Sequence, residues 1–251
     1  MMTLKTPAEL QIMHEANAIV LSTLALVADA AKPGVTTAEL DALAEQHIRA
    51  RGAKPAFKGY RGYPATLCTS VNDVIVHGIP SSRCQLREGD VLSLDCGAVW
   101  QGFVGDAAMT IPVGHVSGEA EHLMRTTREC LDHAVSVVRA GARLSDIGAT
   151  VQAHAEAQGF SVVREFVGHG IGRAMHEDPQ VYNFGPAGRG PELRPGLVLA
   201  IEPMVNAGSP GVQIDDDGWT ARTEDGKLSA HFEFSVAVTD DGPRVLGVGG
   251  V

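Results

Sequence analysis

The 251-residue sequence has few cysteines, and none is spaced as a zinc knuckle or a redox pair. Its four cysteines are Cys68, Cys84, Cys96 and Cys130, without a C-x-x-C pair among them. Structural zinc sites and thioredoxin-like motifs both use closely spaced pairs. We therefore expect free thiols and a reducing, cytoplasmic compartment.

Net positive charge and a membrane-targeting segment are also missing. With 30 acidic against 20 basic residues, the formal net charge is -10 at pH 7, which disfavours nucleic acid or an anionic membrane surface as the main partner. The N-terminus lacks the charged start and apolar segment of a signal peptide. The apolar stretch 16–28 is followed by Asp29 and is shorter than the roughly 20 residues of a spanning helix. We expect neither DNA nor a membrane as a partner.

Helical and strand patterns follow one another along the chain. Thr6 before Pro7 predicts a capped helix that ends at Pro33-Gly34, and Thr36 starts a second helix that ends at Gly52. Alternating apolar residues and turn residues predict the remaining elements. These are short strands over 56–79, a hairpin of 91–99 with 103–113, helices over 117–139 and 145–158, and a strand over 230–238. The order is helices and then strands, twice.

The second half of the sequence repeats the first at a shift of 107 positions. Segment 86–95 falls on 193–202, and both read L-R-x-G-x-V-L-x-(L/I)-acid. The same shift places Gly34, His47 and Gly52 on Gly141, His154 and Gly159. Chance does not easily produce these matches at one gapless offset. We predict a single α+β domain over 1–251, with halves of about 6–113 and 114–242 packed about a pseudo-twofold axis.

Acidic residues occupy related places in the two halves. The repeat makes Asp95 and Glu202 equivalent, each at the end of a buried strand, while Asp106 lies across the predicted hairpin from Asp95. Glu233 faces away from the apolar side of its strand, and glycines flank His169. One such acid alone is usually a turn or cap residue, but carboxylates buried together repel one another unless a cation lies between them. Oxygen-rich ligands with one imidazole favour Mn, Co, Fe or Zn in a hydrolytic two-metal site.

Five segments make the pattern specific. They are Gly59-Tyr60-Arg61-Gly62-Tyr63-Pro64, Val76-His77-Gly78-Ile79-Pro80, Gly168-His169-Gly170-Ile171-Gly172, Ile201-Glu202-Pro203-Met204-Val205-Asn206 and Asp217-Gly218-Trp219-Thr220. They resemble segments of the type I methionine aminopeptidases, and the resemblance runs from about residue 6 to about residue 242. It implies the pseudo-twofold "pita-bread" α+β fold in one catalytic domain. It also implies removal of the initiator methionine from nascent proteins and peptides with a small second residue.

The resemblance implies a role for each predicted metal ligand. Asp106 and Glu233 would bridge two divalent metal ions, drawn from Co, Mn, Fe and Zn. Asp95 would complete the shell of one ion, and His169 with Glu202 that of the other. A bridging hydroxide would then attack the carbonyl of the N-terminal methionine.

Catalytic and substrate-binding residues are implied in the same way. Glu202 would be the acid/base, His77 would contact the scissile amide, and His176 would stabilise the oxyanion. The methionine pocket would comprise Phe57, Tyr60, Tyr63, Cys68, Met175 and Trp219. The sequence departs from the family pattern at Phe57, Met175, His231 and Phe234. A monovalent-cation site would comprise Asn72, Val74 and Ser229.

Other functions remain open at this point. A proline-directed peptidase of the same fold, such as prolidase or aminopeptidase P, carries an additional N-terminal domain, for which we expect no room before Thr6. A non-catalytic binding paralogue would have lost metal ligands, whereas all five are present. Type II methionine aminopeptidases carry a helical insertion that the segment between Glu202 and Glu233 has no space for. We expect a monomer; contact with the ribosome suits an enzyme of nascent chains, although no basic segment indicates it.

Overall fold

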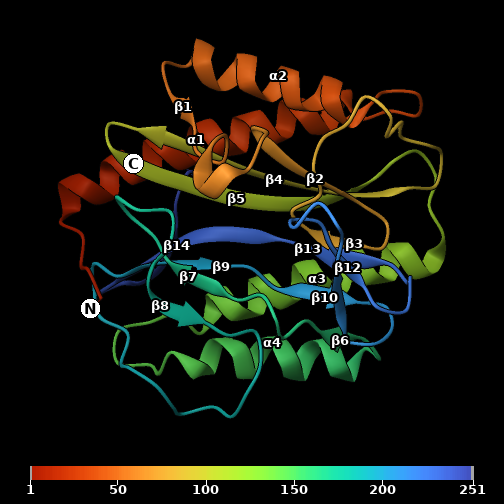
Figure 1. The fold of residues 1–251 in the computed structure, drawn as a ribbon. Coiled ribbons are helices and arrows are strands. Elements are labelled where there is room, and N and C mark those ends of the chain that lie inside the picture. Colours follow the sequence, from red (N-terminus) through yellow and green to blue (C-terminus); the bar gives the residue numbers. More distant parts are fainter. Residues whose placement is uncertain (1, 250–251) are drawn as a thin grey trace.

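Two pairs of helices enclose an antiparallel β-sheet in the computed structural model, which describes residues 2–249 (Figure 1). Helices α1 (Pro7–Ala30) and α2 (Thr37–Ala50) cover one side, and α3 (Gly118–Ser136) and α4 (Ser145–Ala157) cover the other. The strands are β1 (Lys54–Pro55), β2 (Leu67–Val71), β3 (Val74–Val76), β4 (Val91–Trp100), β5 (Phe103–Pro112), β6 (Ser161–Val162), β7 (Gly168–Gly170), β8 (Glu177–Val181), β9 (Val198–Ile201), β10 (Met204–Asn206), β11 (Val212–Ile214), β12 (Ala221–Thr223), β13 (Ser229–His231), β14 (Glu233–Thr239) and β15 (Gly242–Val245). The predicted α+β class is confirmed.

The first helices begin where their capping residues predict. Thr6 and Thr36 each accept the backbone N–H of the glutamate three residues on, and that glutamate accepts the backbone N–H of the threonine in return. Such a capping box satisfies backbone donors that a helix start leaves unpaired. The third helix ends at Ser136, earlier than the predicted boundary at 139.

The hairpin of β4 and β5 is the longest ladder in the sheet. Its turn is the two-residue pair Gln101-Gly102, with φ of 47° and 80°. Positive φ at both positions matches the tight turn that preserves the strand twist, and glycine adopts it at little cost. The main sheet runs β1-β4-β5-β14-β9-β7-β8, with β2 paired to β4 and β15 to β14. This order places strands from both halves side by side.

Two predicted details of the strands are wrong. The predicted strand 230–238 is broken at Phe232: β13 pairs with β10 in a separate sheet, whereas β14 pairs with β5 and β9. Asp95 does not end its strand, because β4 continues to Trp100 and pairs with β5 along its whole length. Glu202 does follow the last residue of β9, and Pro203 behind it has no N–H to continue the ladder.

The two halves repeat backbone contacts at the shift found in the sequence. Gly34 donates to the carbonyl of Leu86 at 2.8 Å, and Gly141 donates to that of Leu193 at 3.0 Å. Isolated bridges join Thr36 to Gln85 and Arg143 to Glu192. Lys54 opposite Val99 likewise matches Ser161 opposite Asn206. All these pairs differ by 107 positions, so the repeat in the sequence is a repeat in space.

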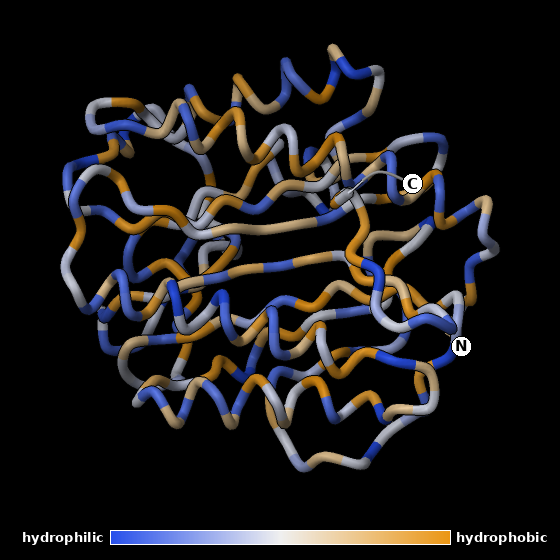
Figure 2. Tube along the Cα trace, turned by 180° about the vertical axis from the view of Figure 1, so that it is seen from behind, coloured by the Kyte–Doolittle hydropathy of each residue, from blue (hydrophilic) through white to orange (hydrophobic). Residues whose placement is uncertain are grey.

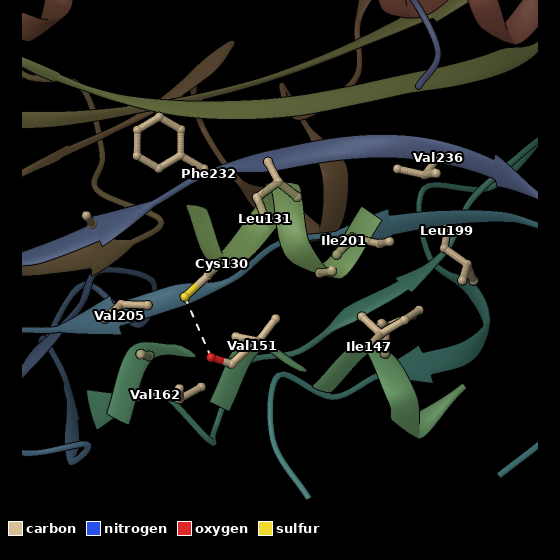
Figure 3. Packing of buried hydrophobic residues seen from close by; sticks show 14 of the residues in the cluster. Cys130, Leu131, Ile147, Val151, Val162, Leu199, Ile201, Val205, Phe232 and Val236 are labelled. Carbon is tan, nitrogen blue, oxygen red and sulfur yellow. Dashed lines mark hydrogen bonds between the residues drawn. The ribbon is translucent and has the colours of Figure 1, made fainter. Parts of the chain in front are cut away.

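Each helix pair packs on its own strands and forms its own core. The helices alternate hydrophilic and hydrophobic residues along their length (Figure 2). In the second half, Leu131 of α3 and Val151 of α4 pack with Leu199 and Ile201 of β9, and Cys130 points its thiol at the carbonyl of Val151 (Figure 3). The corresponding core of the first half joins α1 and α2 to β4 and β5.

Helix α1 is long and apolar enough to cross a membrane by length and composition alone, and no other helix within residues 2–249 is. The apolar stretch 16–28, which by itself is too short to span a membrane, is part of this 24-residue helix. More than half of its apolar window, 56%, is buried inside the protein. Ile19, Val20 and Leu24 pack into the first core, so α1 serves as a core helix.

Candidate metal centre and substrate pocket

A single cavity of about 200 Å³ brings the predicted site residues together. This volume is smaller than the roughly 300–1,000 Å³ of drug-sized ligand sites, so it suits one amino-acid side chain with its adjoining amide. It is lined by Phe57, Tyr60, Arg61, Tyr63, Cys68, His77, Asp95, Asp106, His169, Met175, His176, Glu202, Trp219 and Glu233. Every predicted ligand, catalytic and pocket residue is in this set.

Three of the carboxylates lie on one face of the sheet because of strand register. Ala108 of β5 is opposite Asp95 on one side and opposite Glu233 on the other. Asp106 precedes Ala108 by two positions, so its side chain points to the same face. It is opposite Gly97, which makes Asp95 and Asp106 diagonal neighbours across the hairpin. The small Ala108 and Gly97 leave the space between the acids open.

The remaining two predicted ligands are Glu202, the equivalent of Asp95 in the repeat, and His169. His169 on β7 is opposite Ala200, two residues before Glu202. Its Nδ1 lies 2.9 Å from the carbonyl oxygen of Gly170. Donation from Nδ1 leaves Nε2 as the free lone pair, and Nε2 lies 3.5 Å from Oε1 of Glu202. The imidazole is thus oriented as a metal ligand.

The carboxylates lack the partners that buried charges need. Asp95 Oδ1, Asp106 Oδ1 and Glu233 Oε1 are buried without a hydrogen-bond partner among the described residues. Within residues 2–249, no lysine or arginine forms an ion pair with these acids or with Glu202. Orphaned anions of this kind are costly unless a cation neutralises them.

Burial and mutual repulsion both act on the pKa values of these groups. Burial raises the pKa of Asp95 to about 7. Burial, followed by the charges of neighbouring carboxylates, raises the pKa values of Asp106, Glu202 and Glu233 well above their ordinary range. A cation would reverse both effects. Ligand atoms of Asp106, His169 and Glu233 all lie within 4.8 Å of one another, so the donor set fits bound divalent metal.

Two histidines that are not predicted ligands face the same cavity. His77 lies edge-on to Phe166 and Trp219, with ring centroids 5.2 and 6.1 Å away, and burial lowers its pKa to about 4. His176 lies 4.3 Å from the ring of His169, and burial, with Arg61 nearby, lowers its pKa. Both imidazoles are therefore neutral at pH 7. The hydroxyl of Tyr60 lies 2.8 Å from Nδ1 of His176.

The apolar end of the cavity is held by backbone contacts. The hydroxyl of Tyr63 lies 2.9 Å from the carbonyl oxygen of Leu67 and 3.1 Å from that of Gly78. Its ring meets Trp219 edge-on at 5.1 Å. Cys68 is opposite Asp95 in the β2–β4 ladder, and burial raises the pKa of its thiol, so the sulfur is neutral. Aromatic and sulfur groups of this kind suit an apolar, flexible side chain.

The structure also places residues whose position the sequence did not indicate. Arg61, between the two pocket tyrosines, lines the cavity with a φ of 49°. His231 lies behind Glu202, with its Nε2 buried and 3.8 Å from Oε2 of that glutamate. This nitrogen has no hydrogen-bond partner in the part of the chain that the structure describes. Phe234 packs in the core with the guanidinium of Arg128 4.8 Å from its ring, so it faces away from the metal ligands.

The residues suggested for a monovalent cation lie together on two strands. Asn72 precedes β3, which carries Val74, and Ser229 begins β13. The backbone N–H of Ser229 donates to the carbonyl oxygen of Asn72 at 2.9 Å. Its hydroxyl lies 2.8 Å from Oδ1 of Asn206.

Both the sequence and the fold match those of known proteins. The model of metallopeptidase family M24 matches residues 11–240. A methionine aminopeptidase of Clostridium perfringens is 52% identical over 246 residues, which cover 98% of each chain. The crystal structure of methionine aminopeptidase from Thermotoga maritima has a TM-score of 0.97 at 43% identity, covering 98% of this chain and 99% of that one. The prolidase from Pyrococcus horikoshii shares the fold, with a TM-score of 0.78 at 21% identity, and 64% of its length is covered.

Proposed function

Since the chain belongs to the methionine aminopeptidases of metallopeptidase family M24, we propose that it removes the initiator methionine from nascent proteins and peptides with a small second residue. One observation carries the proposal: all five predicted ligands line one small cavity whose other wall is aromatic and sulfur-rich. The cavity of about 200 Å³ has room for one side chain with its adjoining amide.

Two divalent metal ions would be held by the five ligands. Asp106 and Glu233 would bridge them, Asp95 would complete one shell, and His169 with Glu202 the other. The buried, unpaired oxygens of Asp95, Asp106 and Glu233 support this assignment. When bound, such a pair supplies a hydroxide at neutral pH and polarises the carbonyl. Because O and N donors of this type accept Co, Mn, Fe or Zn, the donor set leaves the native metal open.

The protein's own groups would move the protons and stabilise charge. Glu202 would take a proton from the attacking water and deliver it to the leaving amine, a role supported by its place in the cavity beside His169. The neutral His77 would contact the scissile amide. With Tyr60 beside Nδ1 of His176, the Nε2–H of His176 would donate to the oxyanion.

The apolar end of the cavity would receive the methionine side chain. Phe57, Tyr63, Cys68, Met175 and Trp219 line it, and Tyr63 and Trp219 are in edge-on contact. A thioether packs well against such aromatic edges and sulfur atoms. We further propose that the chain is one catalytic domain and a cytoplasmic monomer, that Asn72, Val74 and Ser229 hold a monovalent cation, and that the ribosome is a partner.

A proline-directed peptidase of the same fold is the alternative to test. Metal-loaded protein is incubated with Met-Ala-Ser, Met-Leu-Ser and Gly-Pro. We expect release of methionine from Met-Ala-Ser, much slower cleavage of Met-Leu-Ser, and no cleavage of Gly-Pro. Cleavage of Gly-Pro but not Met-Ala-Ser would replace the proposal with the proline-directed function. Metal binding with no cleavage of any peptide would indicate a binding paralogue.

A further inference from the structure

The loop 171–176 carries two residues of the cavity on one short connection between β7 and β8. Met175 and His176 lie at its end, and His169 lies at its start on β7. Strand pairing with β9 fixes His169, whereas the loop beyond it has fewer backbone ties. One of them is the carbonyl of Gly172, which accepts from the N–H of Val104 at 2.8 Å. The positions of Met175 and His176 therefore depend on what else holds the loop.

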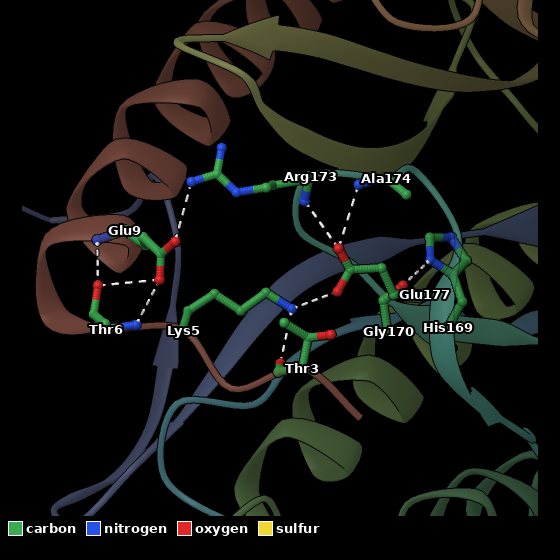
Figure 4. A network of polar contacts seen from close by, with 9 residues as sticks. All are labelled: Thr3, Lys5, Thr6, Glu9, His169, Gly170, Arg173, Ala174 and Glu177. Atoms are coloured by element: carbon green, nitrogen blue, oxygen red, sulfur yellow. Dashed lines mark hydrogen bonds and ion pairs between the residues drawn. The ribbon is translucent and has the colours of Figure 1, made fainter. Parts of the chain in front are cut away.

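The carboxylate of Glu177 holds the loop from inside (Figure 4). Its Oε1 accepts the backbone N–H of Arg173 at 2.9 Å and that of Ala174 at 3.3 Å. Its Oε2 lies 2.6 Å from Nζ of Lys5. The side chains of Lys5 and Glu177 are only 3% and 14% exposed, so water screens this pair little.

Lys5 is itself fixed to the second half of the protein. Its backbone N–H donates to the carbonyl of Gly196 at 2.7 Å, and its Nζ also donates to the carbonyl of Thr3 at 3.0 Å. Gly196 lies in the turn just before β9, the strand that leads to Glu202. Lys5 thus joins the loop to a strand of the metal centre.

The space around this pair is closed. A Cβ added to Gly172 would lie 2.5 Å from Cε of Lys5 and 2.6 Å from Oε1 of Glu177. Arg173 of the loop also forms an ion pair with Glu9, but the side chain of Arg173 is 66% exposed. Exposed pairs of this kind contribute little, because solvent and salt screen them. The buried pair is therefore the stronger constraint.

We propose that Lys5 and Glu177 are positioning residues, which act through the loop by holding His176 and Met175 against the cavity. Neither residue lines the cavity. The inference rests on the proposed function, because it assigns His176 to the oxyanion and Met175 to the methionine side chain. The pair would thereby set both kcat and the preference for methionine over other apolar residues.

Four proteins form a double-mutant cycle: the unaltered chain, Lys5→Met, Glu177→Gln, and the double variant. Methionine keeps the length of the lysine, and glutamine keeps an oxygen for the N–H groups of Arg173 and Ala174. Arg49→Met is the control, since it removes an exposed ion pair with Glu45 on α2. Each protein is assayed for bound Co²⁺, for kcat and KM on Met-Ala-Ser and Leu-Ala-Ser, and for amide hydrogen exchange without metal.

Lys5→Met should lower kcat about 10-fold and reduce the preference for Met-Ala-Ser, with bound Co²⁺ unchanged. The amides of Arg173 and Ala174 should exchange faster, because their acceptor is no longer fixed. The double variant should recover part of the loss, since it leaves no buried charge unpaired. Arg49→Met should match the unaltered chain in every assay.

Unchanged kcat and unchanged exchange in Lys5→Met would overturn the proposal. So would a loss of metal and of global stability that accounts for all the lost activity. If Lys5→Met does not fold, Glu177→Gln is judged by the same criteria. If the unaltered chain cleaves no methionine peptide, the proposed function fails, while hydrogen exchange still shows whether the pair holds the loop.

Discussion

Replacing Asp95 with asparagine should have opposite effects on the protein with and without its metal ions. The substitution keeps the size of the side chain and removes its charge. Without metal, this charge lies near other buried carboxylates, and no lysine or arginine within residues 2–249 forms an ion pair with it. In the proposed metal-loaded site, the same carboxylate would be a ligand. We therefore expect Asp95→Asn to stabilise the metal-free fold and to weaken the stabilisation that metal provides.

The size of the effect follows from the pKa of Asp95, which burial raises from 3.8 to about 7. The folded state then holds the proton more tightly than the unfolded state, so stability falls as the pH rises between those values and levels off above them. At about 1.4 kcal/mol per pH unit, the raised pKa of Asp95 costs the metal-free fold about 2 kcal/mol at pH 5, where the unfolded chain releases the proton and the fold keeps it, and about 4 kcal/mol at pH 8.

Urea unfolding with a chelator at pH 5 and pH 8 measures this difference. Asp95→Asn should be more stable than the unaltered chain at pH 8, by up to about 4 kcal/mol, with roughly half that gain at pH 5. Asp29→Asn, at an exposed position of α1, serves as the control. A variant that is less stable at pH 8, or a difference that does not change with pH, would refute the reasoning.

Three further predictions follow from the same site. Asp106→Ala should abolish both bound metal and turnover, because it removes a bridging ligand; two ions per chain in this variant, measured by metal analysis, would contradict that role. His176→Ala should keep its metal and lose about 10²–10³-fold in kcat, as removal of an oxyanion donor does. An unchanged kcat would exclude the role of His176 as an oxyanion donor. Burial lowers the pKa of His77 to about 4 and that of His231 to about 3, so these two groups should destabilise the metal-free fold as the pH falls below about 6.5. Thermal melts of the metal-free unaltered chain and of His77→Gln between pH 7 and pH 5 test this. An equal change of melting temperature with pH in the two proteins would contradict it.

Local chemistry made much of the fold predictable. Threonine caps gave the starts of α1 and α2, because a capping box involves only residues close together in the chain. The repeat of 107 positions supplied the long-range relation that local patterns lack. The repeat made Asp95 and Glu202 equivalent from the sequence alone. The equivalent backbone hydrogen bonds of Gly34 and Gly141 show the same repeat in the structure.

Features that depend on contacts between distant segments were not predictable. The strand 230–238 breaks at Phe232 because two sheets compete for its two ends, and its alternation of apolar residues does not reveal that. The pair of Lys5 and Glu177 joins positions 172 residues apart. The pocket residues could be named only through the resemblance, because no spacing rule brings Phe57, Met175 and Trp219 together.

Titration of the metal-free chain with Co²⁺, while methionine release from Met-Ala-Ser is recorded, tests the central claim most directly. Without metal, we predict no turnover; turnover should rise as ions bind and level off when two are bound per chain. Asp106→Ala should show neither the binding nor the rise. Full turnover in the presence of a chelator, or two bound ions with no release of methionine, would contradict the account.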